Sequence, residues 1–443
     1  MIKKYGLNEF GFAALLALFM VTGMVLIVTF SVSAIILTRT QVSKNLIFSA
    51  QSYYSAESGA EDAVLRKLKN YDLPSGVLNL DGASINQSFS TVGSVTTIDS
   101  VSTYLNNVRK TRVRLTITAD IVSFHYGVQI GEGGLEMSNN STIDGNIYSN
   151  GKIQGDSGAK ITGDAYVAGG NKIKNVTVGL SARANTIENS KICGDAYYQT
   201  IDASSLNFLN APTKTFCSDP LTPGAAYPGS SDPDILPEPI SASNIADWKA
   251  DAVSGGTISG NYNVANNISL GPKEITGNLV MTSNNKTLSV AGTLYVRGNI
   301  DISNGSAVQC LASYGENSCV VLADGWIHVS NNGTFSGSGA AGSFLMMLTT
   351  LQCDGTSATS PDGKACGDHN GAVDIHNQAT GVIFYASRGM INLHNGVDIT
   401  EATAHKLRLD NLASVTYNQG LVNASFSSGP GAGWQIDNWN ETE

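Results

Sequence analysis

The stretch "TIDGNIYSNGKI" (Thr142–Ile153) sets a pattern that close variants repeat along most of the chain. The next variant, "KITGDAYVAGGNKI" (Lys160–Ile173), has the same order of an apolar residue, a glycine, an Asn or Asp, and a short apolar run. Further variants are "KICGDAYY", "TISGNYNV", "EITGNLVM" and "SVAGTLYV", around Gly194, Gly260, Gly277 and Gly292.

A second phrase is interleaved with the first and consists of an apolar residue followed by Ser-Asn-Asn or a similar polar turn. Asparagine tolerates the left-handed backbone conformation, and its side-chain amide can bond to an asparagine in a neighbouring turn. We therefore predict structural turn residues at Asn140, Asn285, Asn304, Asn332, Asn377 and Asn395.

Short apolar strands separated by Gly and Asn at intervals of roughly 15–20 residues indicate a solenoid. The intervals are too short for a propeller blade or a helical repeat. We predict a mainly β protein with a right-handed parallel β-helix over 128–428, whose coils stack about 4.8 Å apart around Val, Ile and Leu. A β-sandwich is the alternative fold.

An uncharged stretch near the start of the chain, "FGFAALLALFMVTGMVLIVTFSVSAIIL" (Phe10–Leu37), predicts a membrane-spanning helix. As a helix it is about 42 Å long, more than the roughly 30 Å of a bilayer core. It is also longer than the roughly 7–15 apolar residues of a secretory signal. Because Lys3 and Lys4 precede it, we expect a single pass with a cytoplasmic N-terminus and an extracytoplasmic C-terminal domain.

The helix is expected to continue beyond the apolar stretch and to cover residues 12–70. Residues 39–70 contain no proline, and their apolar side chains recur three and four positions apart. Pro74 and Gly76 are expected to end the helix. Alternating residues then predict a β connector over 71–127, and residues 429–443 form a C-terminal tail. The apolar residues that define the helical spacing are Leu46, Ala50, Tyr53, Tyr54, Ala60, Val64 and Leu68.

Two motifs carry a resemblance to a known family. The basic leader (1–11), the Gly11–Phe12 junction and the apolar helix resemble a type IV prepilin. The segment "YYSAESGAEDAVLRKL" (Tyr53–Leu68) resembles the corresponding stretch of PilX-type pilus assembly proteins. The repeated coils are also similar to those of bactofilins, and the C-terminal segment resembles that of β-helical relatives of the PilX type.

The resemblance implies cleavage between Gly11 and Phe12 by a prepilin peptidase, and packing of the helix against other pilin subunits. Leu16 stands where most pilins carry a glutamate, which favours a minor or terminal subunit over an ordinary shaft subunit. The expected function is that of a minor pilin-like protein, anchored in the inner membrane or carried on the pilus or cell surface. Its β-helix would be displayed outside for pilus initiation, or for a role at the tip or in surface adhesion, with surface glycans or proteins as candidate further partners.

Two alternatives to this function remain. An uncleaved, permanently anchored β-helix would be a structural scaffold of the cell envelope. Some β-helices are polysaccharide-active enzymes that use clustered aspartates. Here Asp144, Asp164 and Asp195 flank repeat glycines, but sister coils carry Asn or Thr in their place. We therefore predict no catalytic residue, no cofactor and no enzymatic activity.

Six cysteines pair most simply in sequence order, since each pair brackets a short polar loop and the domain is exported. The sequence also permits fourteen other pairings or free buried thiols. An insertion rich in Pro, Asp and Ser, at about 203–248, is expected to be a surface loop pinned by the first pair. The expected disulfides are Cys193–Cys217, Cys310–Cys319 and Cys353–Cys366.

The net charge and the histidines indicate whether nucleic acid or a metal ion is an expected ligand. The net charge is −10 and no basic cluster is present, so we predict no nucleic acid partner. His328, His376 and His394 occupy similar positions in successive repeats, and we call them the histidine column. Such a column binds metal only when carboxylates join it. We interpret these residues as hydrogen-bonded turn residues and predict no metal site.

Overall fold

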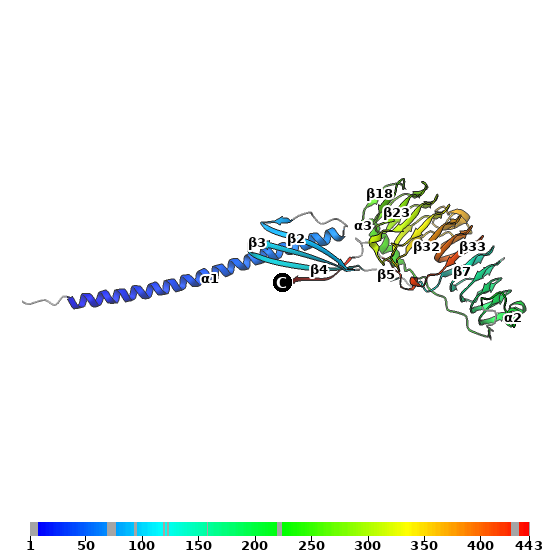
Figure 1. The fold of residues 1–443 in the computed structure, drawn as a ribbon, viewed down its shortest axis with the longest axis horizontal. Coiled ribbons are helices and arrows are strands. Elements are labelled where there is room, and N and C mark those ends of the chain that lie inside the picture. Colours follow the sequence, from blue (N-terminus) through cyan, green and yellow to red (C-terminus); the bar gives the residue numbers. More distant parts are fainter. Residues whose placement is uncertain are drawn as a thin grey trace, which may run out of the picture. The chain divides into compact units, whose positions relative to one another are not determined.

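A computed structural model describes residues 8–68, 77–92, 95–117, 120–121, 124–156, 158–218, 224–426 and 434–442. They form two compact units, one of Met1–Thr116 with Ile436–Glu443 and the other of Ile117–Gln435. The protein is mostly β with one long apolar helix (Figure 1). Most of the expected leader and the expected helix breakers, Pro74 and Gly76, lie outside the described residues.

The first unit packs helix α1 (Asn8–Leu68) against an antiparallel sheet. The strand order is β1-β2-β3-β4-β36, so a strand from the C-terminal end of the chain lies beside β4. Ile98 and Val113 are register partners and are fully buried, which places one face of the sheet in the core of this unit. The strands are β1 (Leu78–Leu80), β2 (Ala83–Val92), β3 (Val95–Tyr104), β4 (Asn107–Ile117) and β36 (Trp434–Thr442).

The second unit is built on one large sheet, in which every described pairing is parallel. We call this sheet the stack. Two runs of strands form it. The first run comprises β6 (Val128–Met137), β7 (Thr142–Asp144), β8 (Ile147–Ser149), β9 (Ile153–Gly155), β10 (Lys160–Ile161), β11 (Ala165–Val167), β12 (Lys172–Lys174), β13 (Thr177–Val178), β14 (Ala182–Glu188), β15 (Lys191–Ile192), β16 (Ala196–Ile201) and β17 (Ala226–Pro228).

In the second run of the stack, each strand from β18 to β29 pairs with the strand three places later. Three strands therefore make one coil. The run comprises β18 (Thr257–Ile258), β19 (Tyr262–Asn263), β20 (Ile268–Leu270), β21 (Lys273–Ile275), β22 (Leu279–Met281), β23 (Thr287–Val290), β24 (Leu294–Val296), β25 (Ile300–Ile302), β26 (Ala307–Cys310), β27 (Cys319–Ala323), β28 (Ile327–Val329), β29 (Thr334–Ser336), β30 (Leu345–Thr349), β31 (Val373–His376), β32 (Thr380–His394), β33 (Asp398–Asp410) and β34 (Ser414–Thr416).

The chain enters the stack at its middle. Strands β33 and β34 pair with β6 and β7, so that Leu407 lies opposite Leu135 and Val415 opposite Ile143. The end of the second run therefore continues directly into the start of the first. Strands β5 (Asp120–Ile121) and β35 (Ser425–Phe426), near the two places where the chain enters and leaves this unit, pair antiparallel with each other.

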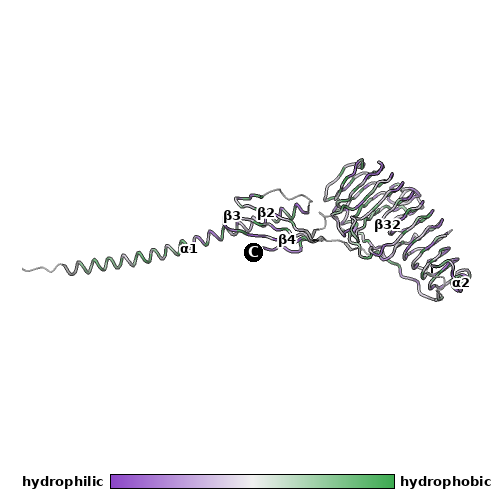
Figure 2. Tube along the Cα trace, viewed as in Figure 1, coloured by the Kyte–Doolittle hydropathy of each residue, from purple (hydrophilic) through white to green (hydrophobic). Residues whose placement is uncertain are grey.

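Apolar side chains form columns inside the stack. Ile143, Ile161, Val178 and Ile192 are successive register partners, and all four are fully buried. Burial of each such side chain stabilises the fold by roughly 1.5–3 kcal/mol relative to exposure. Figure 2 shows the resulting alternation of hydrophobic and hydrophilic residues along the coils.

Close contact between neighbouring coils explains why the repeats contain glycine. The side-chain oxygen of Asn261 accepts a hydrogen bond from the backbone N of Asn278, one coil on, at 2.9 Å. Asn278 makes the same bond to Asn299 at 2.9 Å. A Cβ atom on Gly277 would collide with the Asn261 amide. Glycine is therefore required because the asparagine of the neighbouring coil occupies the space of a side chain.

The insertion was expected to be a surface loop, but it contains regular secondary structure. It contains α2 (Ala203–Leu209) and α3 (Ala242–Ser254), and it connects the two runs of the stack. Residues 226–254 form what we call the strap. The side-chain amide of Asn150 bonds to both backbone groups of Leu236, and Trp248 is almost fully buried. The strap is thus packed onto the stack by specific contacts.

Candidate functional site

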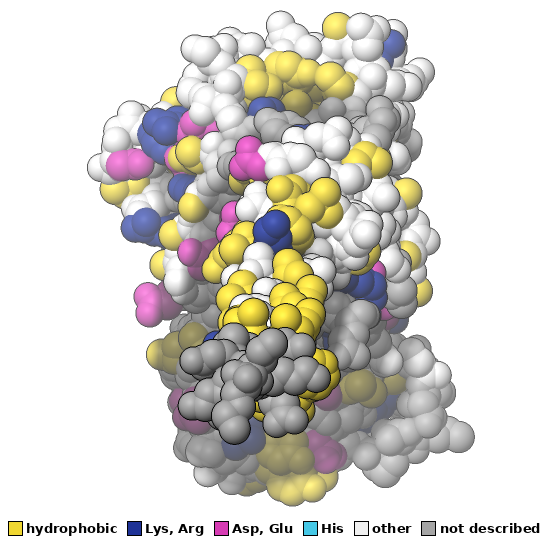
Figure 3. Space-filling view, turned by 90° about the vertical axis from the view of Figure 1, so that its left-hand side faces the viewer, with side chains coloured by type: hydrophobic (Ala, Val, Ile, Leu, Met, Phe, Trp, Pro, Cys, Tyr) yellow, Lys and Arg dark blue, Asp and Glu magenta, His cyan; other side chains and the backbone are white. Residues whose placement is uncertain are grey.

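Helix α1 has two halves with different surroundings. Its first part, Phe12–Thr38, has no charged residue, and no part of its most apolar window is buried. We call it the apolar segment. In Figure 3, hydrophobic side chains cover the helix that points towards the viewer. Among the described residues, α1 is the one helix long and apolar enough to cross a membrane.

The second half of α1 packs on its sheet through small side chains. Ser52, Ala56, Ala60 and Ala63 are fully buried at three- and four-residue spacing. The Ser52 hydroxyl also donates to the backbone oxygens of Ser102 and Asn107, at 2.9 and 3.0 Å. The larger residues chosen from the sequence do not all face the sheet, since Leu46 is 72% and Tyr54 66% exposed.

The processing residues lie at the start of α1. Gly11 belongs to the helix, and the side chain of Phe12 is 71% exposed. Leu16 is also exposed on the apolar segment. Residues 1–7 of the leader lie outside the described residues.

The histidine column is joined by other polar groups. His328 and His376 lie on neighbouring strands with their Nε2 atoms 2.9 Å apart, and His376 stacks on His394 with ring centroids 5.0 Å apart. Asp374 lies between them, only 3% exposed, with its Oδ2 at 3.9 Å from His376 Nε2 and 3.4 Å from His394 Nε2. The column therefore contains the carboxylate that a metal site requires.

Two further residues complete the group. The Nδ1 atom of His328 lies 3.0 Å from Asp301, and that of His369 lies 3.1 Å from Asp374. His369 comes from the short turn η2 (Asp368–Asn370) and lies three residues after the disulfide-bonded Cys366. We call Asp301, His328, His369, Asp374, His376 and His394 the histidine–aspartate cluster.

Hydrogen bonds within the cluster shift the pKa values of Asp374 and His328. Burial opposes ionisation of Asp374, but hydrogen bonds with His394, Asn392 and His369 prevail and lower its pKa to about 2. The hydrogen bond with Asp301 raises the pKa of His328, although burial acts in the opposite direction. The cluster thus combines an anionic centre with several imidazoles.

Sequence reasoning missed half of this cluster. Asp374 lies two residues before His376, so alternation along strand β31 would place both side chains on one face. Asp301 and His328 are register partners, as are His328 and Asp374, but a sequence does not show register. His369 lies in an irregular loop and carries no periodic signal.

The turn asparagines share one backbone conformation. Asn140, Asn285, Asn304, Asn332, Asn377 and Asn395 all have positive φ, between 52° and 63°. An amide ladder runs through Asn377 and Asn395 to Asn411 and Asn139. In two of the Asn-Asn pairs, the ladder uses the first asparagine, Asn331 or Asn139, and not the predicted second one, Asn332 or Asn140.

The aspartates beside repeat glycines have structural partners. Asp164 accepts a hydrogen bond from the backbone N of Ser181, and Asp195 accepts one from that of Ala225, both at 2.9 Å. These are the bonds that asparagine makes in the sister coils, which explains why Asn and Asp exchange at this position.

The structure contains three disulfides, in the sequence-order pairing that we expected. Two of them close loops between or after strands of the second run, and the first lies where the chain leaves the coils for the insertion. They are Cys193–Cys217, Cys310–Cys319 and Cys353–Cys366.

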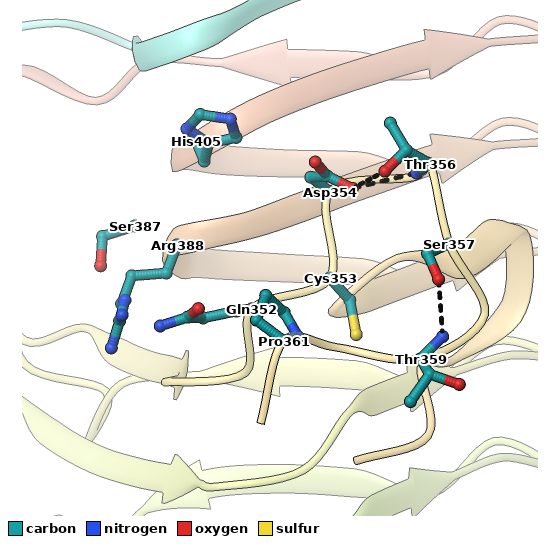
Figure 4. Close-up of a pocket in the computed structure, with 10 residues that line it drawn as sticks. All are labelled: Gln352, Cys353, Asp354, Thr356, Ser357, Thr359, Pro361, Ser387, Arg388 and His405. Atoms are coloured by element: carbon teal, nitrogen blue, oxygen red, sulfur yellow. Dashed lines mark hydrogen bonds between the residues drawn. The ribbon is translucent and has the colours of Figure 1, made fainter. Parts of the chain in front are cut away.

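A cavity of about 450 Å³ lies beside the third disulfide (Figure 4). Arg388 and His405 lie on one side of the view and Asp354 on the other. The carboxylate of Asp354 accepts hydrogen bonds from Thr356, and Arg388 donates to the side-chain oxygen of Gln352. Asp354 and Arg388 thus have hydrogen-bond partners within the cavity wall.

Comparison with known proteins gives little support for an assignment. No model of a known family matches the chain, and no curated protein matches its sequence. Among solved structures, the competence-associated pilin ComZ from Thermus thermophilus is similar, with 11% identity over 89% of this chain and 98% of that chain. The TM-score is 0.22, which supports no argument about a shared fold.

Proposed function

We propose that the protein is a minor pilin-like subunit of a type IV pilus or a related machine, without enzymatic activity. The observation that carries this proposal is α1, a single helix whose apolar segment has no cover and whose second half is fixed to a sheet. Such a helix needs lipid or other apolar helices around its first half. The resemblance of Gly11–Phe12 and Tyr53–Leu68 to PilX-type proteins supports pilin helices as those partners.

The same helix would serve in two environments. Before assembly it would anchor the protein in the inner membrane, with the N-terminus in the cytoplasm. After cleavage by a prepilin peptidase it would pack against other pilin subunits. Leu16 fits the membrane state, because a glutamate in lipid is costly without a partner. Its presence supports a minor or terminal position, since the usual charged residue is missing.

We further propose that the stack is a right-handed parallel β-helix displayed outside the cytoplasm. Three strands per coil and parallel pairing between coils support this fold. Three disulfides support an oxidising compartment. The polar Asn and Ser turns on the outside would then meet surface glycans or proteins during initiation or adhesion.

N-terminal sequencing of the membrane-bound protein tests the proposal. We expect the mature chain to begin at Phe12 in cells with a prepilin peptidase. Gly11→Val should block cleavage, whereas Gly23→Val, in the same helix with no neighbour within 4 Å, should not. An intact Met1 in the wild-type protein would instead favour the second candidate, a permanently anchored envelope scaffold.

Imaging of surface fibres separates these candidates further. A strain that lacks the protein should make fewer or altered fibres. The wild-type protein should restore them, and Gly11→Val should not. Normal fibres in the deletion strain would contradict a role in pilus assembly.

A further inference from the structure

We propose that the histidine–aspartate cluster binds one divalent transition-metal ion, such as Zn²⁺, through His328, Asp374 and His376. This proposal is independent of the pilin role. Imidazole nitrogen with a carboxylate oxygen is a ligand set typical of Zn²⁺ and related ions. The three ligand atoms lie within 4.8 Å of one another.

The spacing of the ligand atoms suits a metal ion. Tetrahedral zinc with bonds of about 2.0–2.1 Å holds its ligand atoms roughly 3.3 Å apart. The two Nε2 atoms of His328 and His376 are 2.9 Å apart, and His376 Nε2 is 3.9 Å from Asp374 Oδ2. These two distances lie within about 0.6 Å of the tetrahedral value, and the ligand atoms of His328 and Asp374 are less than 4.8 Å apart.

Neighbouring groups orient these ligands. When the Nδ1–H of His328 donates to Asp301, the lone pair of that ring is at Nε2, which faces His376. The amide of Asn392 holds Oδ1 of Asp374 at 2.5 Å and leaves Oδ2 towards the histidines. Carboxylate and amide partners of this kind are the usual second layer around a metal ion.

The backbone makes the site rigid while leaving it open to solvent. His328 and Asp374 are register partners on the paired strands β28 and β31, and His376 follows on β31. Sites on paired strands keep their geometry better than sites on loops. The side chains of His328 and His376 are 25% and 20% exposed, so an ion can enter from water.

Asp374 also forms a second group of three with His369 and His394. We favour the first group because its two histidines and its aspartate all lie on strands, and because Asp301 fixes the tautomer of His328. His369, by contrast, lies in the turn η2 and is 45% exposed. Single substitutions distinguish the two groups, because each variant should lose most of its Zn²⁺ affinity only if its residue belongs to the group that binds the ion.

Zn²⁺ binding by the full-length protein in detergent, measured by calorimetry after chelator treatment, tests the proposal. We expect one ion per chain and a loss of affinity of at least about 100-fold in His328→Ala and Asp374→Asn. His369→Ala removes only a partner of Asp374 and should lose about tenfold. The matched control is His405→Ala, outside the cluster, which should bind as the wild type does.

Three results would overturn the proposal. One is a wild-type protein that binds Zn²⁺ no more tightly than Asp374→Asn does. Another is His369→Ala losing binding while His328→Ala keeps it, which would move the site to the second group. Because a variant could fail to fold, X-ray absorption of the Zn²⁺-loaded wild type gives a separate check. Its spectrum should show imidazole scattering, and a shell without imidazole would also contradict the proposal.

Discussion

The two units cover their apolar residues in different ways. In the second unit, columns such as Ile143, Ile161 and Val178 are closed inside the stack. In the first, the second half of α1 is covered by its sheet, but Phe12–Thr38 is not. The second unit therefore covers these columns with its own residues. The first reaches its lowest free energy only when lipid or other helices supply the missing contacts.

The largest expected effect is on the closed core of the stack. Phe384 is fully buried on β32, and Phe384→Ala should lower the free energy of unfolding of the second unit by about 3–5 kcal/mol. Denaturant unfolding followed by tryptophan fluorescence measures this change. Leu180→Ala, at an exposed position of the same unit, should change it by less than about 0.5 kcal/mol. Equal destabilisation by the two substitutions would contradict the closed core of the second unit.

The uncovered segment should respond to charge instead. Val25→Arg puts a charge in the middle of the apolar segment and should cost about 2.5–3.5 kcal/mol of membrane insertion. The fraction of protein that resists carbonate extraction measures insertion. Tyr54→Arg, at a position that is also exposed but lies in the second half of α1, should leave that fraction unchanged. Unchanged extraction of Val25→Arg would show that the segment does not span a bilayer.

A smaller effect is expected from pH, in the contact between strap and stack. Burial raises the pKa of Glu238 to about 7, although a hydrogen bond from Tyr385 lowers it in part. The folded state therefore binds a proton more tightly than the unfolded state, whose carboxyl has a pKa near 4.5. Stability from this group is complete well below pH 4.5 and should fall by roughly 3 kcal/mol as the pH rises to about 7.

Unfolding experiments at several pH values, with Glu238→Gln as the matched variant, check this effect. The variant should lose that part of the pH dependence. Glu401 is fully buried nearby, and burial raises its pKa as it does that of Glu238. The stability of the Glu238→Gln variant should therefore still decrease somewhat with rising pH. An identical profile for wild type and variant would contradict the assignment to Glu238.

The smallest effect concerns the turns. Asn395 has a φ of 60° and takes part in the amide ladder. Asn395→Ala should lower the free energy of unfolding by about 1–2 kcal/mol, because alanine disfavours this conformation. Asn395→Gly removes the ladder bonds but not the conformation, and thermal unfolding of both variants separates the two contributions. If the two variants are equally destabilised, the ladder and not the turn determines the effect.

The sequence predicted the coils because their signal is local. Each repeat carries its own glycine, its asparagine and its apolar strand, so the turn conformations at Asn377 and Asn395 could be expected. The order of the coils could not be predicted, because the pairing of Leu407 with Leu135 joins distant segments without a local signal. The strand from Trp434 to Thr442, expected to be a tail, was missed for the same reason.

The packed face of the helix and the full membership of the candidate site could not be predicted from sequence patterns. Apolar spacing correctly favoured Ala60 but also large residues such as Leu46, whereas the packed face uses Ser52, Ala56 and Ala63 as well, because the helix lies close to the sheet. The histidine column could be seen in the sequence. Asp374 is brought to it by strand register, and His369 by a loop that a disulfide closes.

The pairing of β5 with β35 has a mechanical consequence. Both connections to the second unit leave from the middle of the stack, next to each other, and not from its ends. A tensile load on these connections is thus shared by two adjacent strands, and it does not peel the outermost coils away one after another. Because the incoming end of β5 and the outgoing end of β35 lie side by side, a common pull loads the two strands in parallel and does not shear Ile121 against Ser425.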